Sequence, residues 1–209
     1  MRIGIGITTN NRPKLLKELL DSIHTFTDLK NCIVYVADDS NDCKGVAVKK
    51  NECLRDLKDC DHVFLLDDDV RILKSGWIEN CINSGYDHLL YLNESHNKFI
   101  DCGDGSSIYA DCGGVFMYMT KKAIDNVGSF NEAFTRWGFE HAEYSKRIAL
   151  ATKQQYNYRS LNNMRDFIFA HDYETLAHRS TITDLEKQRY FDENLPKFKI
   201  PIKRIFIPL

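Results

Sequence analysis

Three consecutive aspartates follow an apolar segment in the first third of the chain. Residues 62–66 read His-Val-Phe-Leu-Leu, and Asp67, Asp68 and Asp69 come directly after them. Side chains alternate along an extended chain, so we expect Asp67 and Asp69 on one side and Asp68 on the other. Two carboxylates on one side repel each other unless a cation lies between them, and carboxylate oxygens suit Mg²⁺ or Mn²⁺. The triplet therefore indicates a divalent-cation site, with a solvated acidic turn as the alternative.

The elements around the triplet favour a site at the edge of a parallel sheet. Apolar segments at residues 3–7, 32–37 and 62–66 predict strands, and each ends in a polar or acidic cluster. Helices are expected after Pro13 and over about 46–57. This alternation predicts an α/β fold with a mostly parallel central sheet flanked by helices. Because ligands bind at the carboxyl ends of such strands, we expect the three clusters to form one site.

The second half of the chain has a less regular pattern. Helices are expected over residues 76–84, 121–127 and 139–151, and short strands over residues 89–92, 113–119 and 167–170. In the first strand Gly4 and Gly6 alternate with isoleucines, which predicts close packing on the glycine face. The Gly/Asp/Ser-rich residues 101–107 are expected to form a loop.

The composition is that of a globular domain. The chain has 209 residues, of which 43% are hydrophobic and 28% charged. Its formal net charge of −2 argues against a nucleic-acid partner. No apolar run approaches the roughly 20 residues that a membrane-spanning helix needs. The seven cysteines are odd in number and form no Cys-x-x-Cys pair, which indicates reduced thiols in a cytoplasmic compartment.

Residues 7–12, 36–42 and 65–69 together resemble the nucleotide-binding half of GT-A glycosyltransferases, with those similar to the large family 2 the nearest match. The resemblance implies a Rossmann-like GT-A fold, a nucleotide-diphosphate sugar donor, with UDP as the expected nucleotide, and a bound Mn²⁺ or Mg²⁺. The donor-binding residues that it implies across the chain are Thr8, Asn10, Arg12, Asp38, Asp39, Asp67, Asp68, Gly114 and Trp137.

The resemblance also gives these residues separate roles. Thr8 and Asn10 would line the nucleoside, and Asp39 would face the uracil edge. Asp67 would lie near the ribose and make a secondary metal contact, and Asp69 would be the main metal ligand. A turn or a helix cap stays open as the role of the 38–39 pair.

The second half resembles the acceptor side of the same family. Residues 113–134 carry a Gly-Gly strand, then a helix and Gly-Ser-Phe-Asn-Glu, and residues 137–141 are similar to the Trp-Gly-Gly-Glu-Asp of galactosyltransferase-like members. His141 stands where that family usually has Asp. The resemblance therefore implies Glu140 as the base that deprotonates the acceptor hydroxyl, with His141 and Glu143 behind it. A helix-capping role for Glu140 is the alternative.

Histidines often complete the metal shell in this family. His171 follows the strand expected at 167–170 and lies 30 residues after His141, so the resemblance implies His171 as the third metal ligand, with His178 as second choice. A purely structural histidine is the alternative. Trp137 is interpreted either as a platform for a sugar or as a core residue.

Taken together, these features predict a hexosyl- or pentosyltransferase that inverts the anomeric centre and uses a glycan, glycolipid or glycoprotein acceptor. The domain is expected over residues 1–195, with a nucleotide-binding half at 1–70, an acceptor half at 71–195 and a tail at 196–209. The basic and apolar tail packs on the domain or a partner subunit, or else touches a membrane surface. A sugar-nucleotide nucleotidyltransferase is less favoured because residues 8–12 contain no glycine. A non-catalytic nucleotide- or glycan-binding module stays open, as does an oligomer.

Overall fold

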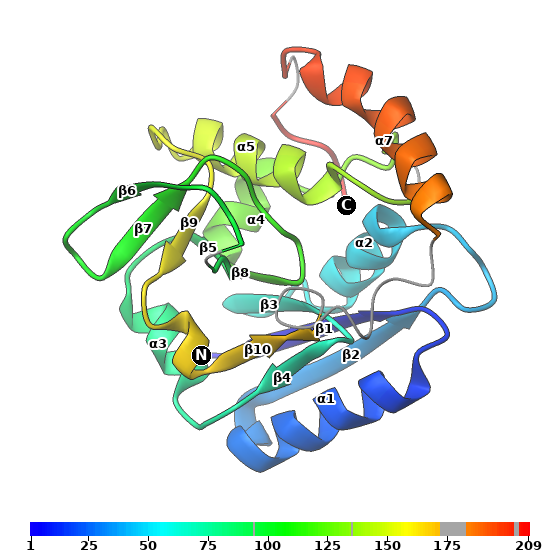
Figure 1. The fold of residues 1–209 in the computed structure, drawn as a ribbon. Helices are drawn as coiled ribbons and strands as arrows, with labels where there is room; N and C mark the ends of the chain where they lie inside the picture. The colour runs from blue at the N-terminus through cyan, green and yellow to red at the C-terminus, as the bar shows by residue number, and fades with distance from the viewer. Residues whose placement is uncertain (94, 135, 172–182, 203–204) are drawn as a thin grey trace.

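The computed structural model describes residues 1–93, 95–134, 136–171, 183–202 and 205–209. Its central sheet has the strand order β2-β1-β3-β8-β5 (Figure 1). The strands are β1 (Ile3–Thr9), β2 (Cys32–Asp38), β3 (His62–Asp67), β5 (His88–Leu90) and β8 (Phe116–Thr120). β1 is parallel to β2 and β3, whereas β8 is antiparallel to both β3 and β5. Four of the five strands therefore run in one direction, and the predicted mostly parallel α/β sheet is confirmed.

Helices cover both faces of this sheet (Figure 1). The helices with buried side chains in the first apolar core are α1 (Pro13–Phe26) and α3 (Trp77–Asn83). Those in the second core are α2 (Val46–Asp56), α4 (Lys121–Val127) and α5 (Glu140–Ala151). The strand alternation separates the two cores: Phe64 and Leu66 of β3 belong to the first, and Val63 and Leu65 to the second.

The glycines of β1 allow α2 to approach the sheet closely. A Cβ on Gly6 would lie 2.7 Å from Cys53 Cβ, and a Cβ on Gly4 would lie 3.1 Å from Cys60 Sγ. Any larger residue at Gly6 would push α2 away from the sheet, so the close packing predicted from the alternating glycines is confirmed. All seven cysteines lie in the described residues and are free thiols.

Two small antiparallel sheets flank the central one. The strands β4 (Val70–Ile72) and β10 (Ile168–Ala170) form the first, and β6 (Lys98–Asp101), β7 (Ser106–Tyr109) and β9 (Arg159–Leu161) form the second. The segment expected as a loop at 101–107 is the tip of the β6–β7 hairpin with its strand ends. The short 3₁₀ helices η1 (Leu29–Asn31) and η2 (Met164–Asp166) lie in connections. Within the described ranges, no helix is long and apolar enough to cross a membrane.

A long C-terminal helix, α7 (Asp184–Lys199), was not predicted. Its sequence signal is a capping box: the Thr183 hydroxyl accepts the backbone N–H of Glu186, whose carboxylate accepts the backbone N–H of Thr183. The helix passes through residue 195, where we placed the end of the domain, and ends before Pro201. After it, the Ile207 N–H donates to Val127 O at 2.9 Å, so this part of the tail packs on the domain.

Candidate active site

The three polar clusters predicted from the sequence meet at one edge of the central sheet. In the strand register Thr8 lies opposite Asp67, and Thr9 lies opposite Asp38. The backbone continues these contacts beyond the strands, because the Asp39 N–H donates to Thr9 O at 2.9 Å and the Asp68 N–H donates to Thr8 O at 3.1 Å. The parallel strands thus bring residues about 30 and 60 positions apart in the chain to one place.

Asp67 is the one aspartate of the triplet that is partly exposed. Its side chain is 25% exposed, and its Oδ1 accepts the Thr8 hydroxyl at 2.8 Å. The Lys50 ammonium lies 3.6 Å from the same oxygen and donates to Gly114 O at 2.7 Å. Lys50 is fully buried on α2, so its charge links Asp67 at the end of β3 to the loop before β8. Lys50 was not among the site residues predicted from the sequence. A signal was present, because Lys50 lies three residues after Ala47 and four before Leu54, which puts a charge in the apolar stripe of the helix.

Asp68 turns to different partners. It is fully buried, accepts the Thr9 hydroxyl at 2.6 Å, and forms an ion pair and a 3.2 Å hydrogen bond with Arg12. Burial raises the pKa of Asp68 to about 6, although the Arg12 charge opposes that rise. Asp68 and Arg12 therefore form a buried pair with each other. Contacts of either residue with a nucleotide-sugar donor stay predictions.

Asp69 and His171 are neighbours in the fold. β10 pairs with β4 so that Ala170 lies opposite Val70, and the His171 N–H then donates to Asp69 O at 3.0 Å. Asp69 is fully buried. A carboxylate and an imidazole at the same strand end are donors that Mn²⁺ accepts. In the described residues, however, no three His, Cys, Asp or Glu side chains are grouped closely enough to hold a metal ion, and His178 lies outside them.

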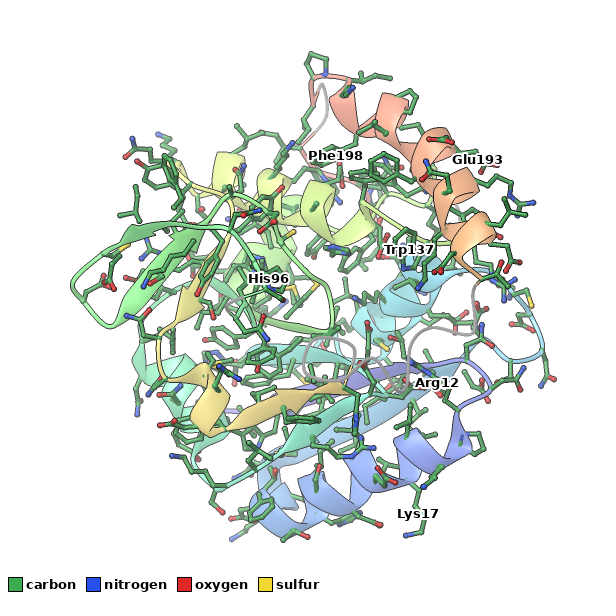
Figure 2. The ribbon with its side chains drawn as sticks, viewed as in Figure 1. Arg12, Lys17, His96, Trp137, Glu193 and Phe198 are labelled. Atoms are coloured by element: carbon green, nitrogen blue, oxygen red, sulfur yellow. The ribbon has the colours of Figure 1, made fainter. Side chains whose placement is uncertain are left out.

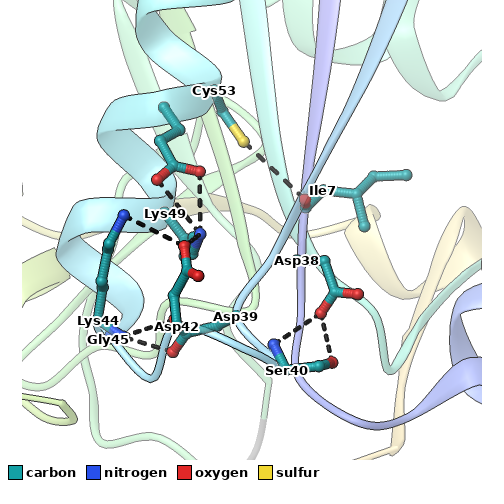
Figure 3. A network of polar contacts seen from close by, with 10 residues as sticks. Ile7, Asp38, Asp39, Ser40, Asp42, Lys44, Gly45, Lys49 and Cys53 are labelled. Atoms are coloured by element: carbon teal, nitrogen blue, oxygen red, sulfur yellow. Dashed lines mark hydrogen bonds and ion pairs between the residues drawn. The ribbon is translucent and has the colours of Figure 1, made fainter.

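The carboxylates at the end of β2 organise the next loop. Asp38 accepts the backbone N–H and the hydroxyl of Ser40, and these hydrogen bonds lower its pKa (Figure 3). Asp39 is buried and accepts the backbone N–H groups of Lys44 at 2.7 Å and Gly45 at 3.0 Å. Both contacts match the turn alternative. Asn10 is partly buried, and the backbone N–H of the next residue, Asn11, donates to Ser40 Oγ at 2.8 Å. This hydrogen bond joins the loops after β1 and β2.

A cavity of about 490 Å³ extends from Asp67 to the N-terminus of α5. The site residues expected from the sequence that line it are Asp67, Gly114, Trp137, Glu140 and His141. Trp137 lies in the loop before α5, next to α7, whose Asn194 donates to the Trp137 carbonyl (Figure 2). Trp137 lines this cavity and is only partly buried, so it is not a fully buried core residue, and its role as a platform for a sugar stays a prediction.

Glu140 and His141 form an ion pair in this cavity. Glu140 Oε1 lies 3.0 Å from His141 Nδ1, and the two side chains are 5% and 18% exposed. Burial opposes both charges, but the attraction between them prevails: it lowers the pKa of Glu140 to about 2 and raises that of His141 to about 10. The position of Glu140 in the first turn of α5 also favours its negative charge. His141 is therefore the counter-ion of the carboxylate.

Two further features define this pair. A Cβ on Gly114 would lie 2.7 Å from His141 Nδ1, so only glycine leaves room for the imidazole. Within the described chain, Glu140 Oε2 is buried and has no hydrogen-bond partner. A buried carboxylate oxygen without a donor is costly, and such atoms in native proteins often mark a functional site.

Glu143, the reserve carboxylate, has a structural partner instead. It accepts two hydrogen bonds from Arg147 Nε at 2.9 and 3.0 Å. Arg147 is itself fully buried and donates to the carbonyls of Val127 and Ser129 at 2.7 and 2.6 Å. This network joins α5 to the end of α4 and the segment after it. Of the two glutamates, Glu140 is the one that lines the cavity.

The strand order and the acidic strand end define a protein of GT-A fold. No protein-family profile matches the chain. The chain is 25% identical over 215 residues to an uncharacterized glycosyltransferase of Acanthamoeba polyphaga mimivirus, with 82% of each covered.

Two solved glycosyltransferase structures share the fold. The mannosyltransferase PcManGT from Pyrobaculum calidifontis, in complex with GDP-Man and Mn²⁺, has a TM-score of 0.56 and 15% identity over 77% of this chain. S. aureus TarS, in complex with UDP, has a TM-score of 0.53 and 15% identity over 72% of this chain. The chain spans about half of the length of each, 54% and 56% respectively. The GT-A fold expected from the sequence is thereby confirmed.

Proposed function

We propose that this protein is a metal-dependent glycosyltransferase that moves a sugar from a UDP-sugar to a hydroxyl group, with inversion of the anomeric centre. The observation that carries the proposal is the buried Glu140 Oε2, which has no hydrogen-bond partner within the described residues and lines the same cavity as Asp67. An acceptor hydroxyl is the donor that this oxygen lacks. The fold supports a nucleotide-sugar donor, because the mimiviral relative is a named glycosyltransferase and the TarS structure contains UDP.

In this mechanism Glu140 takes the proton of the acceptor hydroxyl. The acceptor oxygen forms a bond to the anomeric carbon while the bond from that carbon to the diphosphate oxygen breaks, so a single displacement inverts the centre. His141 keeps Glu140 ionised, so Glu140 can accept a proton. The lowered pKa of Glu140 also makes the carboxylate a weak base. The proton therefore transfers late, once bond formation has made the hydroxyl acidic.

Asp67, Asp69 and His171 would hold the divalent cation once their side chains rotate toward it, because in the described structure they are not yet grouped as a three-ligand site. Their support is the chemistry of the donors and the backbone hydrogen bond between Asp69 and His171. A bound Mn²⁺ or Mg²⁺ would neutralise the charge that develops on the leaving diphosphate. The Lys50 charge beside Asp67 would keep that carboxylate in place before the donor arrives.

The acceptor hydroxyl would belong to a glycan, glycolipid or glycoprotein. The tail contacts at Val127 and Ser129 support the packed alternative for residues 205–209, so the proposal does not require a membrane contact. A sugar-nucleotide nucleotidyltransferase has no comparable support in the site. Such an enzyme needs a basic loop after β1 to bind phosphates, whereas Arg12 of this loop is paired with Asp68.

The test is turnover of a panel of UDP- and GDP-sugars with Mn²⁺, measured as release of the nucleoside diphosphate with and without acceptors. We expect Glu140→Gln to lower the rate of transfer about 10²–10⁴-fold. Asp69→Asn should abolish the extra thermal stability that Mn²⁺ gives in the presence of UDP. The matched control is Glu79→Gln, an exposed glutamate on α3, which should behave as wild type.

Three results would decide against the proposal. Equal turnover in Glu140→Gln and wild type would show that Glu140 is not the base. Binding of UDP without turnover of any donor would favour a binding module. Formation of a nucleotide sugar from a sugar phosphate and a nucleoside triphosphate would favour a nucleotidyltransferase.

A further inference from the structure

The wall of the cavity opposite Asp67 comes partly from the C-terminal helix. Phe191 and Phe198 of α7 line it together with Trp137 and Phe139 of the loop before α5 (Figures 1 and 2). The sequence places these pairs more than 50 residues apart. α7 is therefore part of the site around Glu140 and is more than an appendage of the domain.

α7 also holds the loop that leads to Glu140. The fully buried Asn194 donates from Nδ2 to Trp137 O at 2.9 Å. Gly138 and Phe139 that follow have φ values of +97° and +71°, and a left-handed conformation is unfavourable for phenylalanine. The Phe139 ring lies 5.2 Å from that of Phe191 and 4.9 Å from that of Phe198, centre to centre. These contacts compensate for the strain and fix the first residue of α5.

The two phenylalanines of α7 differ in how much surface they offer. The Phe198 ring is stacked on Phe139, and the Lys146 ammonium lies 3.5 Å from its centre. Phe191 contacts Phe139 but remains 40% exposed although it lines the cavity. An exposed aromatic ring beside Trp137 is a surface on which an apolar or aromatic group can pack.

The charges around the Glu140 end of the cavity disfavour one class of acceptor. Three carboxylates line the cavity: Asp67, Asp111 and Glu140. His141 is paired with Glu140, and the buried Lys50 ammonium lies 3.6 Å from Asp67. Burial lowers the pKa of His96, the other histidine of the lining, and so disfavours its charged form. Among the described residues that line the cavity there is no Lys or Arg. At the Glu140 end of the cavity, an acceptor carboxylate or phosphate would therefore meet no unpaired cation among the described lining residues, and its binding is disfavoured.

We propose that α7 selects the acceptor, and that the acceptor is an uncharged sugar joined to an apolar or aromatic group that packs on Phe191 and Trp137. This inference rests on the proposed function, because it assigns the cavity beside Glu140 to the acceptor. It adds the acceptor class and a specificity-determining residue, Phe191, in a helix that lies outside the motifs resembling the glycosyltransferase family.

The experiment compares three probes: p-nitrophenyl hexosides, methyl hexosides and p-nitrophenyl glucuronides. Binding is measured by ligand-observed NMR, which needs no turnover, and transfer from the active donor gives KM and kcat. We expect the wild type to bind the p-nitrophenyl hexoside most tightly. Phe191→Ala should raise KM for that probe about tenfold, which corresponds to about 1.4 kcal/mol. Its KM for the donor and for the methyl hexoside should change less than twofold.

The matched control is Leu185→Ala on the same helix, where the side chain is 83% exposed and does not line the cavity. Phe191→Leu, checked for folding by circular dichroism, replaces Phe191→Ala if that variant unfolds, and it should give a smaller loss in the same direction. Tighter binding of the glucuronide, or equal KM values in the Phe191 variants and wild type, would overturn the inference while leaving transferase activity intact. If no donor is turned over, the proposed function fails instead, whereas loss of p-nitrophenyl hexoside binding in the Phe191 variants would still support the binding surface.

Discussion

Replacing His141 by leucine tests the electrostatic basis of the site. Leucine has a similar volume but neither charge nor hydrogen-bond donor, so Glu140 would remain buried without its counter-ion at 3.0 Å. Breaking a buried ion pair by removing one partner costs about 3–5 kcal/mol. We therefore expect the free energy of unfolding to fall by about 3 kcal/mol at pH 6 in urea denaturation.

The pH dependence of this loss follows from the two pKa values. The pKa of Glu140 is lowered from 4.5 to about 2, so its contribution to stability is complete above pH 4.5 and is lost as the pH falls toward 2. The pKa of His141 is raised from 6.5 to about 10, so its contribution is complete below pH 6.5 and is lost as the pH rises through 10. The difference in stability between wild type and His141→Leu should be largest between pH 4.5 and 6.5.

The same variant should change the pH–rate profile. Without the imidazolium, burial dominates, and the pKa of Glu140 should rise above its ordinary value of 4.5. The acid limb of kcat/KM should then move to higher pH. Lys121→Gln, which removes an exposed ion pair with Asp125, is the control and should cost less than about 1 kcal/mol. A loss below 1 kcal/mol in His141→Leu, together with an unmoved acid limb, would refute the ion pair as the source of the ionised carboxylate.

Three other variants or treatments probe different parts of the molecule. Lys50→Met should lower the free energy of unfolding by about 2 kcal/mol, because Asp67 and a buried carbonyl lose their donor; an unchanged urea midpoint would contradict this. N-ethylmaleimide at pH 7.5 should label Cys112, which lines the cavity, but not the buried Cys53, whose pKa burial raises to about 12. Mass spectrometry should then show slower labelling of Cys112 with a bound acceptor, and equal rates would place the acceptor elsewhere. Thr183→Ala should cost about 1 kcal/mol by removing the cap of α7, measured by thermal unfolding.

The first half of the fold was predictable because its signals are local. Each of the first three strands is a short apolar run that ends in polar residues. The helices between them are marked by a proline in the first turn or by apolar residues at helical spacing. Their common direction follows from the alternation of strands and helices, so the meeting of Thr8, Asp38 and Asp67 at one edge needed no further information.

The missed features depend on contacts between distant segments. Lys50 looks like an ordinary charge on a helix until Asp67 and Gly114 are placed around it. α7 carries a capping box but a weak apolar stripe, and its buried Asn194 binds Trp137, 57 residues earlier in the chain. Neither partner could be identified from local periodicity.

The sequence by itself determined the class of fold and the edge of the sheet where the chemistry lies, because strand periodicity and the position of acidic residues after strands are local properties. It also supplied the carboxylates, including Glu140. Only the tertiary structure decided how they are used. Asp68 is neutralised by Arg12, whereas Glu140 is paired with His141 in a space that the absence of a side chain at Gly114 leaves open. Charge and burial depend on neighbours from distant segments, so the ionisation of the site and the wall formed by α7 exist only in the folded chain.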